Sequence, residues 1–169
     1  MPLNANKSDD RIAHHPRIND IRDLLTFRLA MLTAASDRVG QRWLRDEFDL
    51  RLLDWRVLGI VAALEPVRFL TIAQTLLVDK GQLSRLVKSL GKRNLIDTET
   101  DPNDLRTILL HLTEKGRALH ARVLSRALER NERFISALEP EELTTFVALL
   151  DKLQPIMANR AGQEQDSEA

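Results

Sequence analysis

The sequence contains no cysteine and no tyrosine, and aromatic residues make up only 4% of its 169 residues. Without cysteine the chain can form no disulfide, no thiolate metal site and no thiol-based redox switch. No apolar run approaches the roughly 20 residues of a membrane-spanning helix, and the N-terminus lacks the apolar segment of a signal peptide. We therefore expect a soluble, cytoplasmic protein with no membrane partner.

Net charge and enzyme motifs are missing as well. The 25 basic and 25 acidic residues cancel, so only local clustering of charge can point to a nucleic acid. No phosphate-binding loop, nucleophile elbow or HExxH pattern occurs. Four histidines (His14, His15, His111 and His120) lack the spacing of a metal site and are expected to be solvated or packed in the core. The sequence therefore predicts neither an enzyme nor a bound metal or cofactor.

The outer parts of the chain predict helices flanked by tails. Residues 1–16 and 160–169 are polar and lack periodicity, so we expect flexible tails. Residues 17–48 predict a helix that is apolar over more than one face, and 113–159 predict two more apolar helices, the second opening at Pro140. These faces exceed what one small domain can bury, which indicates dimerisation helices around a central lobe at 49–112.

The central lobe contains two capping signals eight residues apart. Thr71 with Gln74 forms one capping-box pattern, and Asp79 with Gln82 forms a related one. A buried scaffold helix before them is expected to stop at Pro66, because the residue preceding proline disfavours helical geometry. Two short helices separated by a tight turn predict a helix-turn-helix.

The second of these helices predicts a DNA-reading face. Leucine and valine side chains form one apolar stripe at Leu83, Leu86, Val87 and Leu90. The segment from Asp79 to Asn94 contains five basic residues and one acidic residue, which gives it a local net charge of +4. Such a run is often only a solvated helix face, but the turn before it and the hairpin after it favour DNA. The candidate contacts are Lys80, Gly81, Gln82, Ser84, Arg85, Lys88, Ser89 and Lys92.

A β-hairpin is predicted after this helix. Leu95-Ile96 and the alternating Ile108, Leu110 and Leu112 read as its strands, and Asp101-Pro102-Asn103-Asp104 has turn chemistry. Asp104 and Arg106 are two residues apart and would share one face of an extended strand. They are either a surface ion pair or further DNA contacts, and the preceding helix favours the second interpretation.

Several of these motifs together resemble the MarR family of bacterial transcriptional regulators. The matching residues are Trp55-Arg56-Val57-Leu58, the segment 79–87, Asp101-Pro102, Asp104-Leu105-Arg106 and Leu112-Thr113-x-x-Gly116. The resemblance implies a mainly α-helical homodimer with a small β-hairpin wing, a winged helix-turn-helix carrying N- and C-terminal dimerisation helices. It also implies that Asp104 orients Arg106 toward the minor groove of double-stranded DNA. Leu105 stands where the family usually has an arginine.

The family resemblance also implies a function. We expect a homodimeric repressor on a pseudo-palindromic operator, released by a small aromatic or anionic effector. Arg28, Met31 and Trp55 are hypothesised to line its pocket, although each is also compatible with plain packing or surface exposure. Two alternatives remain: an adaptor that binds proteins rather than DNA, and a ligand-independent DNA-binding activator.

Overall fold

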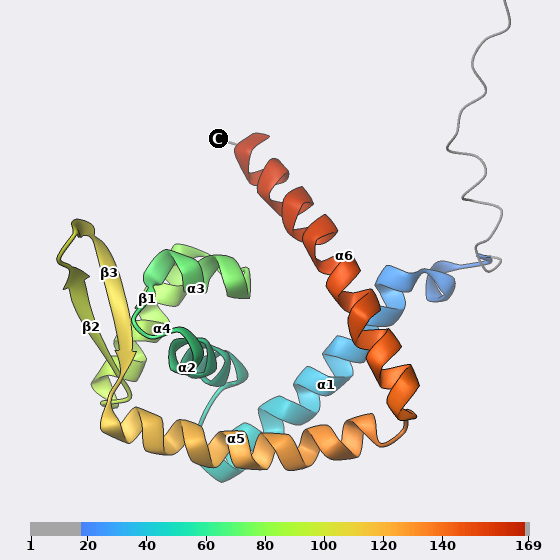
Figure 1. Ribbon diagram of the computed structural model, residues 1–169, viewed down its shortest axis with the longest axis horizontal. Coiled ribbons are helices and arrows are strands. Elements are labelled where there is room, and N and C mark those ends of the chain that lie inside the picture. The colour runs from blue at the N-terminus through green and yellow to red at the C-terminus, as the bar shows by residue number, and fades with distance from the viewer. Residues whose placement is uncertain (1–17, 168–169) are drawn as a thin grey trace, which may run out of the picture. The chain divides into compact units, whose positions relative to one another are not determined.

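The computed structural model describes residues 18–167, with side chains placed for 18–156 (Figure 1). One compact unit extends to His120 and a second begins at Ala121. Within residues 18–167, no helix is long and apolar enough to cross a membrane. The elements are η2 (Ile21–Asp23), α1 (Leu25–Phe48), α2 (Leu52–Leu64), β1 (Val67–Arg68), α3 (Phe69–Leu76), α4 (Lys80–Lys92), β2 (Ile96–Asp101), β3 (Asp104–Leu112), α5 (Glu114–Ile135) and α6 (Pro140–Ser167).

The core of the first unit is built around α2. Val57, Leu58 and Val61 are completely buried on this helix. Full burial of such a side chain contributes about 1.5–3 kcal/mol relative to exposure. The same core receives buried residues from α4 and from the end of β3, including Leu90 and Leu110. The expected scaffold helix before Pro66 is therefore confirmed.

A three-stranded antiparallel sheet with the order β1-β3-β2 lies beside the helices. The hairpin of β2 and β3 is the predicted wing, and its register runs from Ile96 opposite Leu112 to Thr100 opposite Ile108. β1 was not expected from the sequence. It has only two residues, Val67 and Arg68, too few for an alternating pattern to be recognised, and it pairs with β3.

Two helix starts differ from the prediction. Residues 17–48 do not form one helix, because Leu24 is extended (ψ 127°) between η2 and α1. Here the Asp20 carboxylate accepts the Arg22 amide and caps a separate short turn. The expected capping box at Thr71 is wrong as well: α3 begins at Phe69, which places Thr71 inside the helix. Arg68 before it is held in extended geometry by β1.

The C-terminal part of the chain also departs from one expectation. α6 begins at Pro140 as predicted but continues to Ser167, so most of the expected tail at 160–169 is helical. Alanine, glutamine and glutamate in this segment favour helix even without an apolar period. The N-terminal tail predicted at 1–16, with His14 and His15, lies outside the described residues.

Candidate nucleic-acid interface

The tight turn between α3 and α4 has the predicted form. α3 ends at Leu76 and is followed by its C-cap Leu77, whose φ of 52° is left-handed, and Asp79 is the N-cap of α4. The Asp79 carboxylate accepts the backbone N–H of Gln82 at 2.7 Å. An N-cap of this kind contributes about 1 kcal/mol to helix stability. The second capping signal therefore fixes where α4 starts.

α4 separates its apolar and polar sides sharply. Leu83 and Leu90 are fully buried, and Leu86 and Val87 are at most 9% exposed. The predicted DNA contacts on this helix lie on its outer side. Seven of the eight are exposed and Ser84 is half-buried: Lys80, Gly81, Gln82, Ser84, Arg85, Lys88, Ser89 and Lys92. The structure thus brings these eight residues together on one accessible helix.

The C-terminal end of α4 is fixed by contacts that the sequence did not reveal. Asn94, which follows the helix, has a left-handed φ of 56°. Arg93 donates to the backbone oxygen of Asp49 at 2.9 Å, and Lys115 donates to the backbone oxygen of Arg93 at 2.9 Å. Thr113 donates its hydroxyl to the oxygen of Asn94 at 2.7 Å. Arg93 therefore ties α4 to the rest of the unit, although it contributes to the predicted local charge.

The wing carries the other two predicted contacts, Asp104 and Arg106, and both are exposed. The Asp104 carboxylate accepts the backbone N–H of Arg106 at 3.1 Å and the hydroxyl of Thr107 at 2.7 Å. These bonds, that of Thr107 first, lower the pKa of Asp104. Asp104 therefore holds the main chain of Arg106. The direction of the Arg106 guanidinium follows from the position of that backbone.

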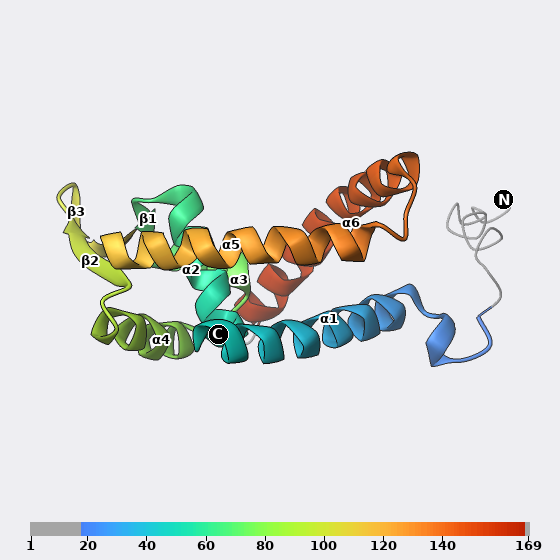
Figure 2. The ribbon, with the colours of Figure 1, turned by 90° about the horizontal axis from the view of Figure 1, so that it is seen from below.

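The turn of the wing is anchored from inside. Asp101 is buried, accepts the Asn103 amide at 2.9 Å and lies 3.6 Å from the Arg68 guanidinium of β1. In both ribbon views the turn of the hairpin lies away from α2, α3 and α4 (Figures 1 and 2). The wing is thus an ordered projection whose tip is accessible.

At the base of the wing, Glu65 and Arg117 hold the last residue of β3. Glu65 accepts the amide of Leu112 at 2.9 Å, and Arg117 pairs with Glu65 and donates to the oxygen of Leu112 at 3.3 Å. Arg117 is the first cause of a lowered pKa of Glu65. No local sequence signal could indicate this clamp, because Glu65 and Arg117 are 52 positions apart.

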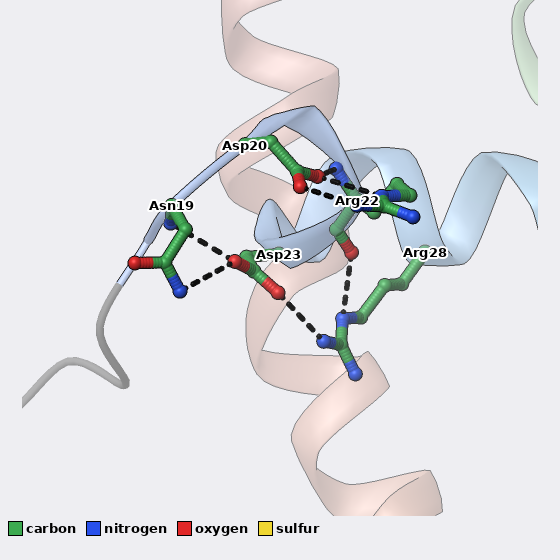
Figure 3. A network of polar contacts seen from close by, with 5 residues as sticks. All are labelled: Asn19, Asp20, Arg22, Asp23 and Arg28. Atoms are coloured by element: carbon green, nitrogen blue, oxygen red, sulfur yellow. Dashed lines mark hydrogen bonds and ion pairs between the residues drawn. The ribbon is translucent and has the colours of Figure 1, made fainter.

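The three residues hypothesised to bind an effector are not gathered by the described contacts. Arg28 donates to the backbone oxygen of Arg22 at 3.0 Å and pairs with Asp23 at 3.3 Å (Figure 3). Met31 is half exposed on α1. Trp55 stacks on the ring of His120, with ring centroids 5.2 Å apart. Burial lowers the pKa of His120, so the neutral imidazole is favoured.

α1 and α2 meet some distance from Arg28. Arg56 of α2 pairs with Asp37 of α1 at 2.7 Å, and Gln41 accepts the Leu52 amide at 3.1 Å. Arg28 precedes Asp37 by 37 − 28 = 9 positions, which is about 13 Å of helix at the usual rise. The contacts of Arg28 therefore belong to the start of α1, while Trp55 stacks on His120 of α5.

The comparisons agree with this architecture. The model of the MarR family matches residues 48–107, from the end of α1 into the wing. An uncharacterised HTH-type transcriptional regulator of Bacillus cereus is 28% identical over 138 residues, covering 81% of this chain and 91% of that relative. A MarR-family regulator from Rhodococcus sp. RHA1 superposes with a TM-score of 0.71 at 25% identity, over 82% of this chain and 96% of the other.

A second solved structure with a similar fold is a complex with DNA. The crystal structure of a MepR–DNA complex from S. aureus matches with a TM-score of 0.70 at 23% identity, covering 78% of this chain and 97% of that one. At this identity the match establishes the fold. The matched family model, the relative and the winged helix-turn-helix geometry therefore all show similarity to the MarR family of transcriptional regulators.

Proposed function

We propose that the protein is a homodimeric repressor that binds a pseudo-palindromic operator and releases it when a small aromatic or anionic effector binds. The proposal that the protein binds DNA rests on the exposed basic face of α4. Arg85, Lys88 and Lys92 are exposed on it, opposite a stripe that is buried in the core, and both of its ends are fixed. A fixed helix with an accessible basic face fits the major groove, where arginine reads guanine edges and lysine contacts phosphate.

The DNA proposal is tested with duplexes that the protein selects from random sequence, measured by fluorescence anisotropy. Arg85→Ala is expected to cost about 1–3 kcal/mol and to relax specificity, whereas Lys88→Ala weakens binding uniformly across sequences. Affinity should fall steeply as salt rises, because each neutralised phosphate releases counterions. Arg38→Ala, which removes an exposed arginine from α1, is the charge-matched control.

A flat salt response, or Arg85 and Lys88 variants that bind like the Arg38 control, would exclude the proposed interface. The protein-adaptor alternative predicts that result, since it gives α4 no role on DNA. The local excess of positive charge on a chain of zero net charge favours the DNA interpretation.

Exposed apolar side chains in the terminal segments support self-association. In the first unit Ile18, Ile21 and Leu25 are each more than half exposed, and in the second Leu128 and Phe134 are as well. Where such side chains adjoin one another, apolar surface marks association sites in soluble proteins. Two copies of α4 would then reach successive major grooves about 34 Å apart.

Sedimentation equilibrium tests this assembly. Leu25→Glu should shift the protein toward the monomer and weaken operator binding, while Leu64→Glu, at an exposed leucine of α2, should leave it dimeric. A wild-type protein that sediments as a monomer at the concentrations where it binds DNA would refute the dimer.

Effector release is tested by thermal shift with a panel of small aromatic carboxylic acids, because a ligand stabilises the state that it binds. An acid that raises the melting temperature should also lower operator affinity, and only by its differential affinity for the two conformations. Transcription in vitro from a promoter overlapping the operator gives the sign of regulation. A panel that stabilises nothing and releases nothing would favour ligand-independent binding.

A further inference from the structure

Leu105 occupies an unusual place for a leucine, at the tip of the wing. It is 80% exposed, more than any other large apolar side chain in the described part of the chain. Its neighbours in sequence are the charged Asp104 and Arg106. An exposed leucine contributes little to the folded core, so this position invites a role in binding.

The backbone at this point is irregular in a defined way. Asp101 pairs with Asp104, and the adjacent residue Thr100 pairs with Ile108. Residues 105–107 lie between these two pairs, so within this fully described hairpin they have no partner on β2. Such bulges redirect side chains and bend the strand that contains them.

The bulge is nevertheless held in place. Asp104 accepts both the Arg106 amide and the Thr107 hydroxyl, and the turn before it is anchored by Asp101 and Arg68. Leu105 is thus displayed on an ordered tip next to an exposed cation. Ordering the tip in the free protein lowers the entropy cost of using it in a complex.

We propose that Leu105 enters the minor groove beside Arg106 and makes the wing discriminate against G·C pairs. This proposal rests on the proposed DNA-binding function. The floor of the minor groove carries only acceptors at A·T pairs, whereas guanine adds a 2-amino donor. A leucine that covers the 2-amino group removes its water and offers no acceptor in return. The amino group is then an unpaired donor, which weakens binding to G·C pairs. Apolar side chains are used in this way by other minor-groove proteins.

Arg106 and Leu105 therefore contribute to binding in different ways. Arg106 supplies electrostatic attraction to the groove, which depends on salt. Leu105 supplies an uncharged contact, whose strength depends on the base pair and not on salt. This difference separates Leu105 from a side chain that merely stabilises the hairpin.

The test uses a duplex that the wild-type protein selects from random sequence, with the base pairs under the wing, located by footprinting, changed to A·T, G·C or I·C. Inosine lacks the 2-amino group of guanine and keeps the major-groove acceptors. Wild-type protein should bind the A·T and I·C duplexes alike and the G·C duplex about tenfold more weakly. Leu105→Ala should shrink this discrimination to about twofold, mostly by losing affinity on A·T and I·C.

Salt dependence provides the second readout. Leu105→Ala should leave the slope of log K against log salt unchanged, whereas Arg106→Ala should lower it by about one for each wing. Leu105→Arg should steepen it by a similar amount. Leu64→Ala, which truncates a leucine that is 51% exposed on α2, is the control for loss of apolar surface and should bind like wild type.

The outcomes are distinguishable. If Arg85→Ala weakens binding while Leu105→Ala retains wild-type affinity and discrimination on all three duplexes, the inference is wrong and the proposed function stands. A wild-type protein that discriminates equally against I·C and G·C would also overturn it, since the amino group would then be irrelevant. If wild-type protein selects no duplex, both the function and the inference fail.

Discussion

A single methyl group added at Gly116 would collide with the backbone that follows α4. An ideal Cβ at Gly116 lies 1.9 Å from the carbonyl oxygen of Leu95, and 2.9 Å from its carbonyl carbon. Both neighbours are main-chain atoms, which cannot rotate away as the end of a side chain can. Gly116→Ala must therefore displace the start of α5 from the end of α4.

The magnitude follows from two opposing effects. Replacing glycine by alanine inside a helix is worth about 0.5–1 kcal/mol in favour of the variant. Overpacking in a region that must shift its backbone typically costs 1–3 kcal/mol, and here it also strains the bond from the Thr113 amide to Leu95 (3.2 Å). Because the collision involves backbone atoms, we expect the overpacking cost to exceed the gain, which leaves Gly116→Ala less stable than wild type by up to about 2.5 kcal/mol.

Gly59 provides a matched control within α2. A Cβ at this position meets nothing within 4 Å, so Gly59→Ala gains helix propensity without a collision. It should be more stable than wild type by about 0.5–1 kcal/mol. Both variants gain helix propensity, so the difference between them isolates the overpacking cost, about 1–3 kcal/mol in favour of Gly59→Ala.

Urea unfolding followed by circular dichroism measures the difference, with the protomer concentration held constant because self-association shifts apparent stability. In thermal scans each 1 kcal/mol corresponds to roughly 2–4 °C for a chain of this size. A Gly116→Ala protein as stable as the Gly59→Ala protein, with an unchanged m-value, would refute the close contact between α5 and Leu95. Reduced operator affinity of the folded variant would show in addition that this contact orients α4.

Three further changes test other parts of the first unit. Asp79→Ala should cost about 1 kcal/mol by removing the N-cap bond to Gln82, and Asp79→Asn should restore most of it, as measured by urea unfolding. Glu65→Gln should flatten the acid side of the stability profile: because Arg117 lowers the pKa of Glu65 in the folded state, its contribution is present above its ordinary value of 4.5 and disappears as the pH falls through the folded pKa. A Glu65→Gln deficit that is equal at pH 7 and pH 3 would contradict this. Leu58→Ala should destabilise the fold by about 2–5 kcal/mol, because its side chain is fully buried in the core; a loss below 1 kcal/mol would mean that the site collapses around the gap.

Local signals in the sequence accounted for much of the candidate site. The carboxylate of Asp79 and the amide of Gln82 are three residues apart, so their bond forms within one turn of chain. The stripe from Leu83 to Leu90 is set by the helical period alone, and it determines which side of α4 is left for lysine and arginine. The mainly α-helical fold with a wing, predicted from such local periods and from the family motifs, was confirmed.

The remaining features depend on residues that are distant in the chain. β1 exists because β3 provides its hydrogen-bonding partner, and the clamp on Leu112 needs Glu65 and Arg117 from either side of the wing. In the sequence Arg93 adds to the positive charge available for DNA, but in the structure its guanidinium donates to the backbone oxygen of Asp49. Their cause is packing between elements, which has no local period or spacing.

The sequence by itself thus determined where α4 begins, which of its sides is buried and which family the motifs resemble. The tertiary structure alone decided how the wing is shaped and held: the unpaired residues 105–107, the anchoring of Asp101 by Arg68 and the close approach of Gly116 to Leu95. The physical reason is the range of the forces that act. Capping and amphipathicity operate over a few neighbouring residues, whereas strand register and backbone contact are fixed only once distant segments have packed together.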